Sequence, residues 1–402
     1  MATQSKLNRI NVSQVLRSIW LNKGISRIRI AEMLHMDKST VTKIVSSLLE
    51  LGIVQTMEEG SASPRGGRKP VPLSINISYG CILGIEIQTD IFNVVIINLQ
   101  GEIISRYRDK IDFGEKELID VFSEILTNIM PHTENLGLLG IVVGLCGIVN
   151  SEEGIIQKSN PLNIVDAYPF CHMAEERFSL PVFIENDANC CCWGELTSQK
   201  TQRPENMLYM LGQFREVETH HAYYSGIGIG FGIVINGKVY SGLEHSAGEF
   251  KSIFSKAPSI SQFSLPDDQI ENIQNKPEEF AALLRELTRN ISLVINFFNL
   301  NHIVIGGEIE CYKDMIEKML THEIQQNWSY PEQMTFSISS SNQGNQAVAY
   351  GAACMFLENL FSIPEMNNRP EKGIKRGIEL LETIKEVQPA ENEDSKFTFN
   401  PI

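Results

Sequence analysis

Glu185, Asn186 and Asp187 form the first group of side chains that could do chemistry. They stand in the sequence Glu-Asn-Asp-Ala-Asn, between the apolar run 182–184 and a helical pattern over 187–197. Carboxylate and amide groups at the end of a strand can hydrogen-bond the hydroxyls of a polyol, and a carboxylate could also deprotonate one of them. A strand-to-helix turn capped by Asn186 or Asp187 explains the same residues equally well, so both interpretations stay open.

Two later segments have the same ambiguity. Residues 225–232 alternate glycine with larger residues, which would let a backbone approach a phosphate or a sugar, but alternating glycines also occur where elements pack closely. Glu249 follows small residues in the loop 245–250, where it could hydrogen-bond a ligand hydroxyl or simply be a solvated acid. Neither segment indicates a ligand site by itself.

A third group of residues is suited to nucleic acid. The exposed face of a predicted helix from about 38 to 51 combines small hydroxyls, which can reach base edges, with lysines, which meet phosphates. A Gly-rich, Pro-bounded loop further along is basic, and such an arm suits a minor groove or the adjacent phosphates. The candidate DNA contacts are Lys38, Ser39, Thr40, Thr42 and Lys43 on the helix and Arg65, Arg68 and Lys69 in the loop.

Apolar spacing predicts the elements around these basic residues. Helices are expected over 11–21, 27–35 and 38–51, followed by a two-stranded wing at 53–57 and 71–75. Two short helices joined by a tight turn are typical of a helix-turn-helix, so residues 1–76 are interpreted as a winged helix-turn-helix. The alternative is a small helical domain followed by a linker.

The remainder of the chain reads as α/β. Strands at 81–87, 92–99, 102–108 and 138–145 are followed by a second series that ends near 303–305. The turns in the sequences INLQGEIIS and VINGKVYSG resemble each other, which indicates two similar lobes facing a cleft over 77–362. The segment 363–402 is predicted to form a helix and a tail that pack on the body or on another subunit.

Charge is divided unevenly between these parts. The chain of 402 residues has a net charge of −15, but residues 1–75 contain eleven Lys and Arg against five acids, giving +6, and the rest carries −21. A basic head on an acidic body suggests two tasks in one chain. The longest apolar run has fourteen residues and four glycines, no signal peptide is apparent, and three of eight cysteines are consecutive, so a cytoplasmic protein with no membrane association is expected.

Together these segments resemble the ROK family of repressors, open reading frames and kinases. The matching landmarks, in order, are the Glu-Asn-Asp-Ala-Asn segment, the Gly-rich hairpin, the Ser-Ala-Gly-Glu-Phe loop, IVIGGEI at 303–309 and GNQAVAYGAACMF at 344–356. With the N-terminal head, the chain is similar to the xylose and N-acetylglucosamine repressors of that family. The resemblance implies a two-lobed, actin-like (sugar-kinase or ribonuclease H-like) fold that binds a sugar or a sugar phosphate, with contacts from Asn160, Asn186, Asp187 and Glu249.

Departures from the family pattern argue against a kinase. Gln88, Thr89 and Asp90 stand where family kinases have the Gly-Gly-Thr of their phosphate loop, and Ile227 replaces a threonine. ATP is therefore not expected, and Asp187, at the family's catalytic base, is interpreted as vestigial. Ser252 stands where many members have a histidine, and no cysteine lies between 192 and 311, so the family's structural zinc site is predicted to be lost and no metal is expected.

The sequence thus predicts a DNA-binding repressor of carbohydrate-utilisation genes, with a sugar or sugar-phosphate effector in a degenerate kinase cleft. It is expected to bind a double-stranded operator as a homodimer or homotetramer. The alternative from the enzyme class is an active ATP-dependent sugar kinase with a DNA-binding head, and a third possibility is a ligand-independent DNA-binding or scaffold protein with a degenerate pocket. The segment 213–224 reads as an insertion, and its His220-His221 pair lacks further metal ligands.

Overall fold

The computed structural model describes residues 2–57, 70–133, 136–178, 180–200, 202–218, 223–256, 261–332 and 334–364. Its N-terminal part, termed the head, consists of three helices and a small antiparallel sheet in the order β1-β3-β2. These elements are α1 (Ala2–Leu21), β1 (Ile25–Ser26), α2 (Arg27–Leu34), α3 (Lys38–Glu50), β2 (Val54–Thr56) and β3 (Pro72–Ile75).

Local signals explain where the head helices begin and end. The Ser26 side chain accepts a hydrogen bond from the Arg29 amide at 3.4 Å and so caps α2, as a serine directly before a helix commonly does. His35 ends α2 in the left-handed conformation, with φ at 51°. The helical spacing of apolar residues over 27–35 would place Ile28 inward beside Ile30, but that placement is wrong, because the Ile28 side chain is 47% exposed. Helix α1 also begins well before residue 11, and strand β1 was not anticipated.

The first lobe of the body is built on a five-stranded mixed sheet in the order β10-β7-β4-β5-β6. Its strands are β4 (Cys81–Ile87), β5 (Ile91–Asn98), β6 (Ile103–Lys110), β7 (Leu138–Leu145) and β10 (Val182–Asn186). Helices α4 (Leu118–Ile129) and α5 (Phe170–Arg177) contribute to the hydrophobic cluster of this lobe, and β8 (Ile148–Asn150) and β9 (Ile155–Lys158) form a separate hairpin.

The second lobe has a sheet in the order β13-β12-β11-β14-β15. Its strands are β11 (Met207–Glu218), β12 (Tyr223–Ile235), β13 (Lys238–Val239), β14 (His302–Gly307) and β15 (Ser337–Ser340). Its hydrophobic cluster includes α7 (Asp267–Ile270), α8 (Pro277–Phe298) and α9 (Lys313–Gln326). The single-turn 3₁₀ helices are η1 (Met130–His132), η2 (Ile273–Asn275), η3 (Glu308–Tyr312) and η4 (Gly344–Gln346).

The two sheets have the same internal order. In each, three consecutive strands form antiparallel hairpins, and the first of the three is followed in space by two parallel strands. The two turns that look alike in sequence therefore occupy equivalent places, between β5 and β6 and between β12 and β13. Gly101 and Gly237 both adopt positive φ there, at 81° and 71°, which glycine allows without strain.

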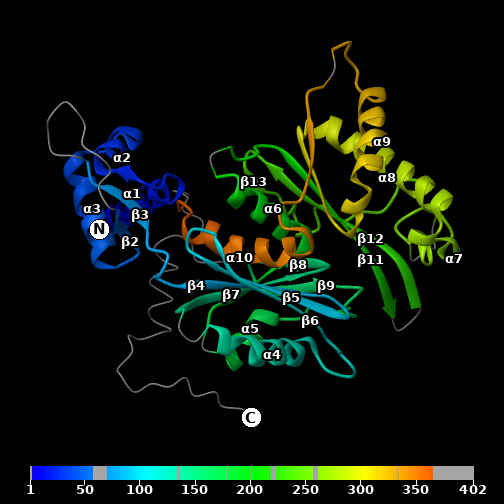
Figure 1. Cartoon of the computed structure of the whole chain (residues 1–402), viewed down its shortest axis with the longest axis horizontal. Helices are drawn as coiled ribbons and strands as arrows, with labels where there is room; N and C mark the ends of the chain where they lie inside the picture. Colours follow the sequence, from blue (N-terminus) through cyan, green and yellow to red (C-terminus); the bar gives the residue numbers. More distant parts are fainter. Residues whose placement is uncertain are drawn as a thin grey trace.

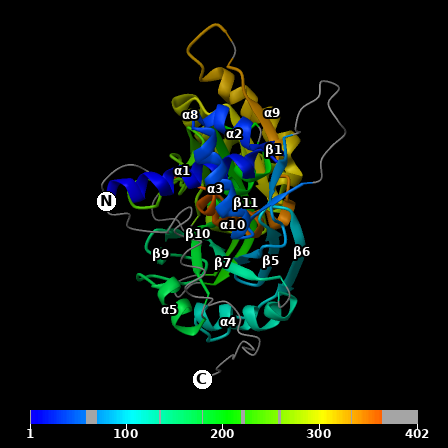
Figure 2. The same cartoon turned by 90° about the vertical axis from the view of Figure 1, so that its left-hand side faces the viewer.

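Helices α6 (Asp187–Ser198) and α10 (Ala347–Leu360) lie between the two sheets, with α4 below and α8 and α9 on the opposite side (Figure 1). Every residue of α10 is buried, as expected of a helix packed on all sides. In the turned view the head lies in front of the body (Figure 2). Core residues of the head and of both central helices belong to one hydrophobic cluster.

No helix among the residues that the structure describes is long and apolar enough to cross a membrane. The predicted tail helix beyond 364, the histidine pair 220–221 and the basic loop residues Arg65, Arg68 and Lys69 lie outside the described residues. The segment interpreted as an insertion contributes to β11 and β12, which pair from Met207–Val234 to Glu218–Tyr223 and form a long hairpin.

Candidate functional site

Asp187 is the first residue of α6 and lies where β10 ends. The Asn186 side chain caps the helix, because its Oδ1 accepts a hydrogen bond from the Asn189 amide at 3.1 Å. Its Nδ2 donates to the Gly147 carbonyl at 3.0 Å, so both ends of the amide already bind the backbone. The capping interpretation of this segment is therefore confirmed for Asn186. Asp187 is 8% exposed, and its Oδ1 accepts from the Ala188 amide at 2.8 Å.

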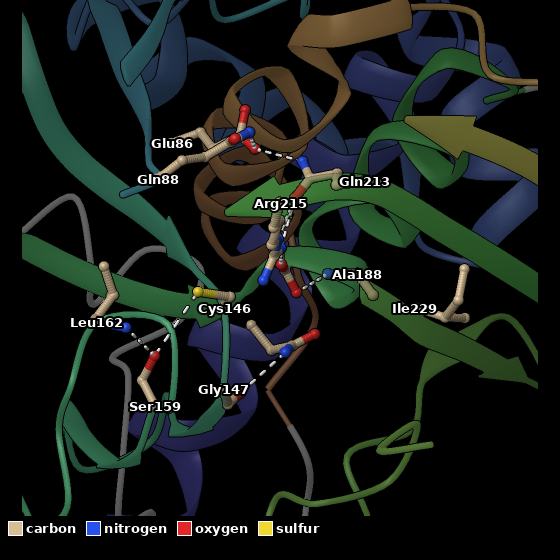
Figure 3. A network of polar contacts seen from close by, with 12 residues as sticks. Glu86, Gln88, Cys146, Gly147, Ser159, Leu162, Ala188, Gln213, Arg215 and Ile229 are labelled. Carbon is tan, nitrogen blue, oxygen red and sulfur yellow. Dashed lines mark hydrogen bonds and ion pairs between the residues drawn. The ribbon is translucent and has the colours of Figure 1, made fainter. Parts of the chain in front are cut away.

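An arginine from the second lobe lies against Asp187. The Arg215 guanidinium, on β11, approaches Asp187 Oδ2 to 3.4 Å, and both side chains are largely withdrawn from solvent (Figure 3). Burial raises the pKa of Asp187, while the positive charge of Arg215 opposes that rise. The Arg215 charge makes the Asp187 carboxylate a weaker base than the same buried carboxylate would be without that cation, and the ion pair engages its Oδ2, so this contact works against proton abstraction from a hydroxyl.

The polar network continues from Arg215 to the other lobe. Arg215 Nε donates to Gln213 Oε1 at 3.2 Å, and Gln213 Nε2 donates to Glu86 Oε1 on β4, also at 3.2 Å (Figure 3). Gln88 and Asn93 donate to the same carboxyl group at 2.6 and 2.7 Å. Burial raises the pKa of Glu86, which is 2% exposed. Gln213 and Arg215 thus connect Glu86 to Asp187 across the two lobes.

The alternating glycines of β12 explain how α6 and Arg215 fit against this strand. A Cβ on Gly232 would lie 2.4 Å from both the Ala188 carbonyl oxygen and Cys192 Sγ, so the α6 backbone packs directly on the strand. At Gly230 the nearest atoms would be the Ala188 Cβ at 3.7 Å and Asp187 Oδ1 at 3.9 Å. Of the two interpretations of these glycines, approach to a ligand and close packing of elements, the contacts of Gly232 support close packing.

Glu249 and Asn160, the other two predicted sugar contacts, lie in different electrostatic surroundings. Glu249 is exposed as a residue, yet Asp187 and Arg215 both influence its carboxyl group, and burial followed by the Asp187 charge raises its pKa. The Glu249 carboxyl group therefore lies within electrostatic range of Asp187 and Arg215. Asn160 is exposed after β9, where its carbonyl accepts from the Asn163 amide at 3.1 Å.

A small solvent-open pocket of about 30 Å³ lies between the lobes on the Glu86 side. Its lining includes two carboxyl groups, Glu86 and Glu308, and one cation, Arg108. The amides of Gln88, Asn93, Gln213 and Asn345 complete its polar surface. The pocket is thus rich in hydrogen-bonding groups and has more acidic than basic side chains.

The loop that follows Glu249 is held by hydrogen bonds among neutral side chains. Ser252 Oγ accepts from Asn290 Nδ2 and from the Phe254 amide, both at 3.1 Å. The Gln262 side chain binds both the amide and the carbonyl of Ile229, at 2.8 and 2.7 Å. Among the described residues, no group of three or more His, Cys, Asp or Glu side chains is arranged to hold a metal ion.

On the head, α3 has one apolar and one polar face. Val41, Ile44, Val45 and Leu48 are buried against the rest of the head. The candidate contacts face outward: Lys38, Ser39, Thr42 and Lys43 are exposed and Thr40 is half-buried. Asp37 precedes α3 but makes no side-chain cap.

Residue patterns along the chain did not identify Gln213, Arg215 or the role of Glu86. The first two fall in the segment that read as an insertion. One signal was available: on an antiparallel strand, a run of glycines leaves room for a long side chain from the neighbouring strand. Arg215 pairs with Gly226, and its side chain would lie 3.6 Å from a Cβ at Gly228.

Comparison with known proteins links the sequence of this chain to a protein family. The model of the ROK family matches residues 82–253 and 268–359. The xylose repressor of Caldicellulosiruptor bescii is 24% identical over 414 residues, which cover 91% of this chain and 100% of that protein.

Two solved structures share the fold. A ROK family transcriptional regulator described as a homologue of the Escherichia coli MLC protein has a TM-score of 0.67 at 21% identity, covering 87% of this chain and 96% of its own. A ROK family glucokinase from Streptomyces griseus, in complex with glucose and AMPPNP, has a TM-score of 0.54 at 17% identity, covering 69% and 99%. The first likeness extends over a larger share of this chain than the second.

Proposed function

Because the chain belongs to the ROK family, we propose that it is a transcriptional repressor of carbohydrate-utilisation genes that responds to a sugar or a sugar phosphate. The observation that carries the DNA-binding part is the polar face of α3, which presents lysines and small hydroxyls while its other face packs in the head. The likeness to a xylose repressor along 91% of the chain supports the same assignment.

In this proposal residues 1–76 are a winged helix-turn-helix. Helices α2 and α3 form the helix-turn-helix, α3 enters the major groove, and β2 and β3 form the wing. Thr40 and its neighbours read base edges, while Lys38 and Lys43 bind phosphates. The basic loop between the wing strands contacts the minor groove or its phosphates.

The effector binds at the Asp187 end of the cleft. Asp187 and Glu249 accept hydrogen bonds from sugar hydroxyls, and Asn186, whose side-chain amide binds the Asn189 amide and the Gly147 carbonyl, holds the start of α6 in place beside them. Asn160, exposed on its loop, is the most peripheral of the four proposed contacts. Because the relatives include a xylose repressor, D-xylose is the first sugar to test.

Neither ATP nor zinc fits the residues present. A triphosphate in the pocket on the Glu86 side would meet the Glu86 and Glu308 carboxyls, and Gln213 and Arg215 occupy the path from there to Asp187. The loop that holds zinc in many family members is here held by Ser252, Asn290 and Gln262, whose neutral hydroxyl and amide groups are not the thiolate and imidazole ligands that structural zinc requires.

The protein acts in the cytoplasm as a homodimer or homotetramer on double-stranded DNA. Two heads then read two half-sites about 34–36 Å apart. Exposed apolar side chains on α8, with Phe297 at 86% and Phe298 at 51%, offer a surface that a second copy would cover. Light scattering on the full chain measures the oligomeric state directly.

The test of this function uses duplexes selected from a random library by the full chain. Thr40→Ala should reduce discrimination between the selected and a scrambled duplex by about 1–3 kcal/mol if Thr40 reads a base. Thr127→Ala, which removes an exposed hydroxyl from α4 on the far side of the body, is the matched control and should change nothing. Equal binding of selected and scrambled DNA by the unaltered chain would refute the repressor assignment.

The effector is tested on the same complex with a panel of pentoses, hexoses and their phosphates. An effector should lower operator affinity and raise the melting temperature of the free protein by mass action. A panel in which no compound changes either quantity would refute sugar sensing but not DNA binding.

A sugar kinase remains the second candidate, because Asp187 is retained at the start of α6. A coupled assay with ATP and the same sugars separates the two functions. Turnover that Asp187→Asn abolishes would show that Arg215 leaves the carboxylate when substrate binds, and it would overturn the non-enzyme proposal.

A further inference from the structure

Four segments from different parts of the chain meet around Trp20 of α1, and we term Trp20, Leu99, Lys200 and Phe361 the Trp20 cluster. The Trp20 ring is 1% exposed and stacks on the Phe361 ring, with centroids 4.8 Å apart and planes 16° from parallel. Its Nε1 donates to the Leu99 carbonyl at 3.1 Å, and Lys200 Nζ lies 4.4 Å from the ring centroid. The head is thus fixed to the body through a specific aromatic contact.

Ion pairs surround this cluster. Arg203 binds both carboxylate oxygens of Glu358 on α10, at 2.7 and 3.2 Å, and Arg17 of α1 lies 3.6 Å from the same carboxylate. Arg17 also donates to the Phe361 carbonyl at 3.1 Å. Glu358 is 5% exposed, so a single buried carboxylate balances one cation from the head and one from the body. Such a contact depends on geometry, since a displaced partner leaves an unbalanced charge.

Helix α6 connects this region to the cleft. It begins at Asp187, whose side chain pairs with Arg215, and ends at Ser198, two residues before Lys200. Its 12 residues span about 18 Å at 1.5 Å per residue. A movement of α6 along its axis therefore displaces both Asp187 and the segment that contains Lys200 and Arg203.

Helix α10 must move with α6, because their backbones touch. A Cβ on Gly351 would lie 1.8 Å from the Cys190 carbonyl oxygen, and one on Gly194 would lie 3.2 Å from the Tyr350 ring. The two helix backbones are therefore in direct contact where Gly351 meets Cys190. The C-terminal end of α10 provides Glu358 and is followed by Phe361, so both central helices reach the head at the same place (Figure 1).

We propose that Arg17, through Glu358, is a positioning residue that fixes the head in a place set by the Asp187 end of α6, so that occupancy of the cleft changes the position of α3 on DNA. This inference rests on the proposed function and adds the route by which the two parts communicate. In this structure the Asp187 carboxylate is ion-paired with Arg215. A sugar that takes over Asp187 breaks that ion pair, and α6 and α10 transmit the change to Glu358 and Trp20.

The test is a double-mutant cycle that needs neither operator nor sugar. Arg215→Met breaks the ion pair at the cleft, and Arg17→Met breaks the contact at the head. Amide hydrogen–deuterium exchange in the peptide 10–21 of the full chain reports how firmly α1 is held. We expect Arg215→Met alone to raise the exchange of this peptide at least threefold, and to have no further effect when Arg17→Met is already present.

Two further variants separate positioning from general loosening. Lys313→Met removes an i,i+4 ion pair with Glu317 on α9, in the outer part of the second lobe, and should leave the peptide unchanged. Arg17→Lys keeps the charge and should restore part of the coupling. An unchanged exchange rate in Arg215→Met, or additive effects of the two substitutions, would overturn the proposal. If a variant fails to fold, Trp20→Phe, which keeps an aromatic ring but loses the bond to Leu99, replaces Arg17→Met in the cycle.

The DNA-binding function is tested separately with the same proteins. If the unaltered chain binds no selected duplex, the proposed repressor function fails while the exchange cycle still decides whether cleft and head are coupled. If the chain binds its duplex and Arg17→Met abolishes the effect of an active sugar without lowering the affinity for that sugar, both proposals stand.

Discussion

The substitution Gly232→Ala should distinguish the two explanations of the alternating glycines on β12, which are close packing of elements and approach to a ligand. The added atom would lie 2.4 Å from the Ala188 carbonyl oxygen and 2.4 Å from Cys192 Sγ, whereas ordinary contacts begin at 3.4 Å. Helix α6 would have to retreat by about 1 Å, and overpacking of this kind costs about 1–3 kcal/mol. Because one of the two atoms is backbone, we expect the upper end, about 3 kcal/mol.

Gly230, two residues earlier on the same face, is the matched control. Its Cβ would make only ordinary contacts, at 3.7 and 3.9 Å, and its φ is not in the left-handed region. Gly230→Ala should therefore leave stability unchanged or raise it by about 0.4–1 kcal/mol, through the lower entropy of the unfolded chain.

Urea unfolding of the three proteins, followed by circular dichroism, measures the difference. If the glycines serve helix packing, Gly232→Ala shifts the midpoint strongly and Gly230→Ala does not. Equal destabilisation by both substitutions, or none by either, would refute the packing argument. Loss of sugar binding in Gly230→Ala alone would show that this strand also approaches the ligand.

Three other outcomes are expected. Lys43→Ala should weaken binding to selected and random duplexes alike and reduce the slope of log K against log salt by about one, because it removes one phosphate contact, as titrations at several salt concentrations would show. Burial lowers the pKa of Lys200 from 10.5 to about 8, so the Lys200 amine binds a proton more tightly in the unfolded chain than in the folded one. The unaltered chain should therefore gain stability relative to Lys200→Met as the pH rises from about 8 towards 10, which urea unfolding at several pH values measures. Treatment with 1,10-phenanthroline should leave the melting temperature unchanged, since Ser252 and Gln262 hold the loop that zinc holds in other members, and a clear drop in melting temperature would contradict the predicted loss of the zinc site.

Much of the fold could be predicted from local patterns. Strands 81–87 and 138–145 are confirmed with the same bounds, because each is a largely apolar run, with Glu86 as the one charged residue, and is buried on both faces. The likeness of the two turns correctly indicated a repeated arrangement, since a turn that requires positive φ restricts the residue types in it. The cap at Ser26 was equally visible, because it depends on residues three positions apart.

Only part of the candidate site could be predicted from local sequence patterns. Asp187 and Glu249 were identified from residue type and position, and their charges do influence each other in the structure. Asn186 was proposed as a ligand contact, yet its side chain already binds the Asn189 amide and the Gly147 carbonyl. No local pattern reveals that a side-chain amide donates its hydrogen bond to a carbonyl that is distant in sequence.

The sequence by itself determined the two-part organisation, many of the strands and helices of both lobes, and the acids at the cleft, since each depends on periodicity, charge or residue type within a short window. Only the tertiary structure decided that Arg215 pairs with Asp187, that Gln213 joins it to Glu86, and that Trp20 stacks on Phe361. These contacts join residues 28, 127 and 341 positions apart. Their formation depends on strand register and on the crossing of α6 and α10, which no local pattern specifies.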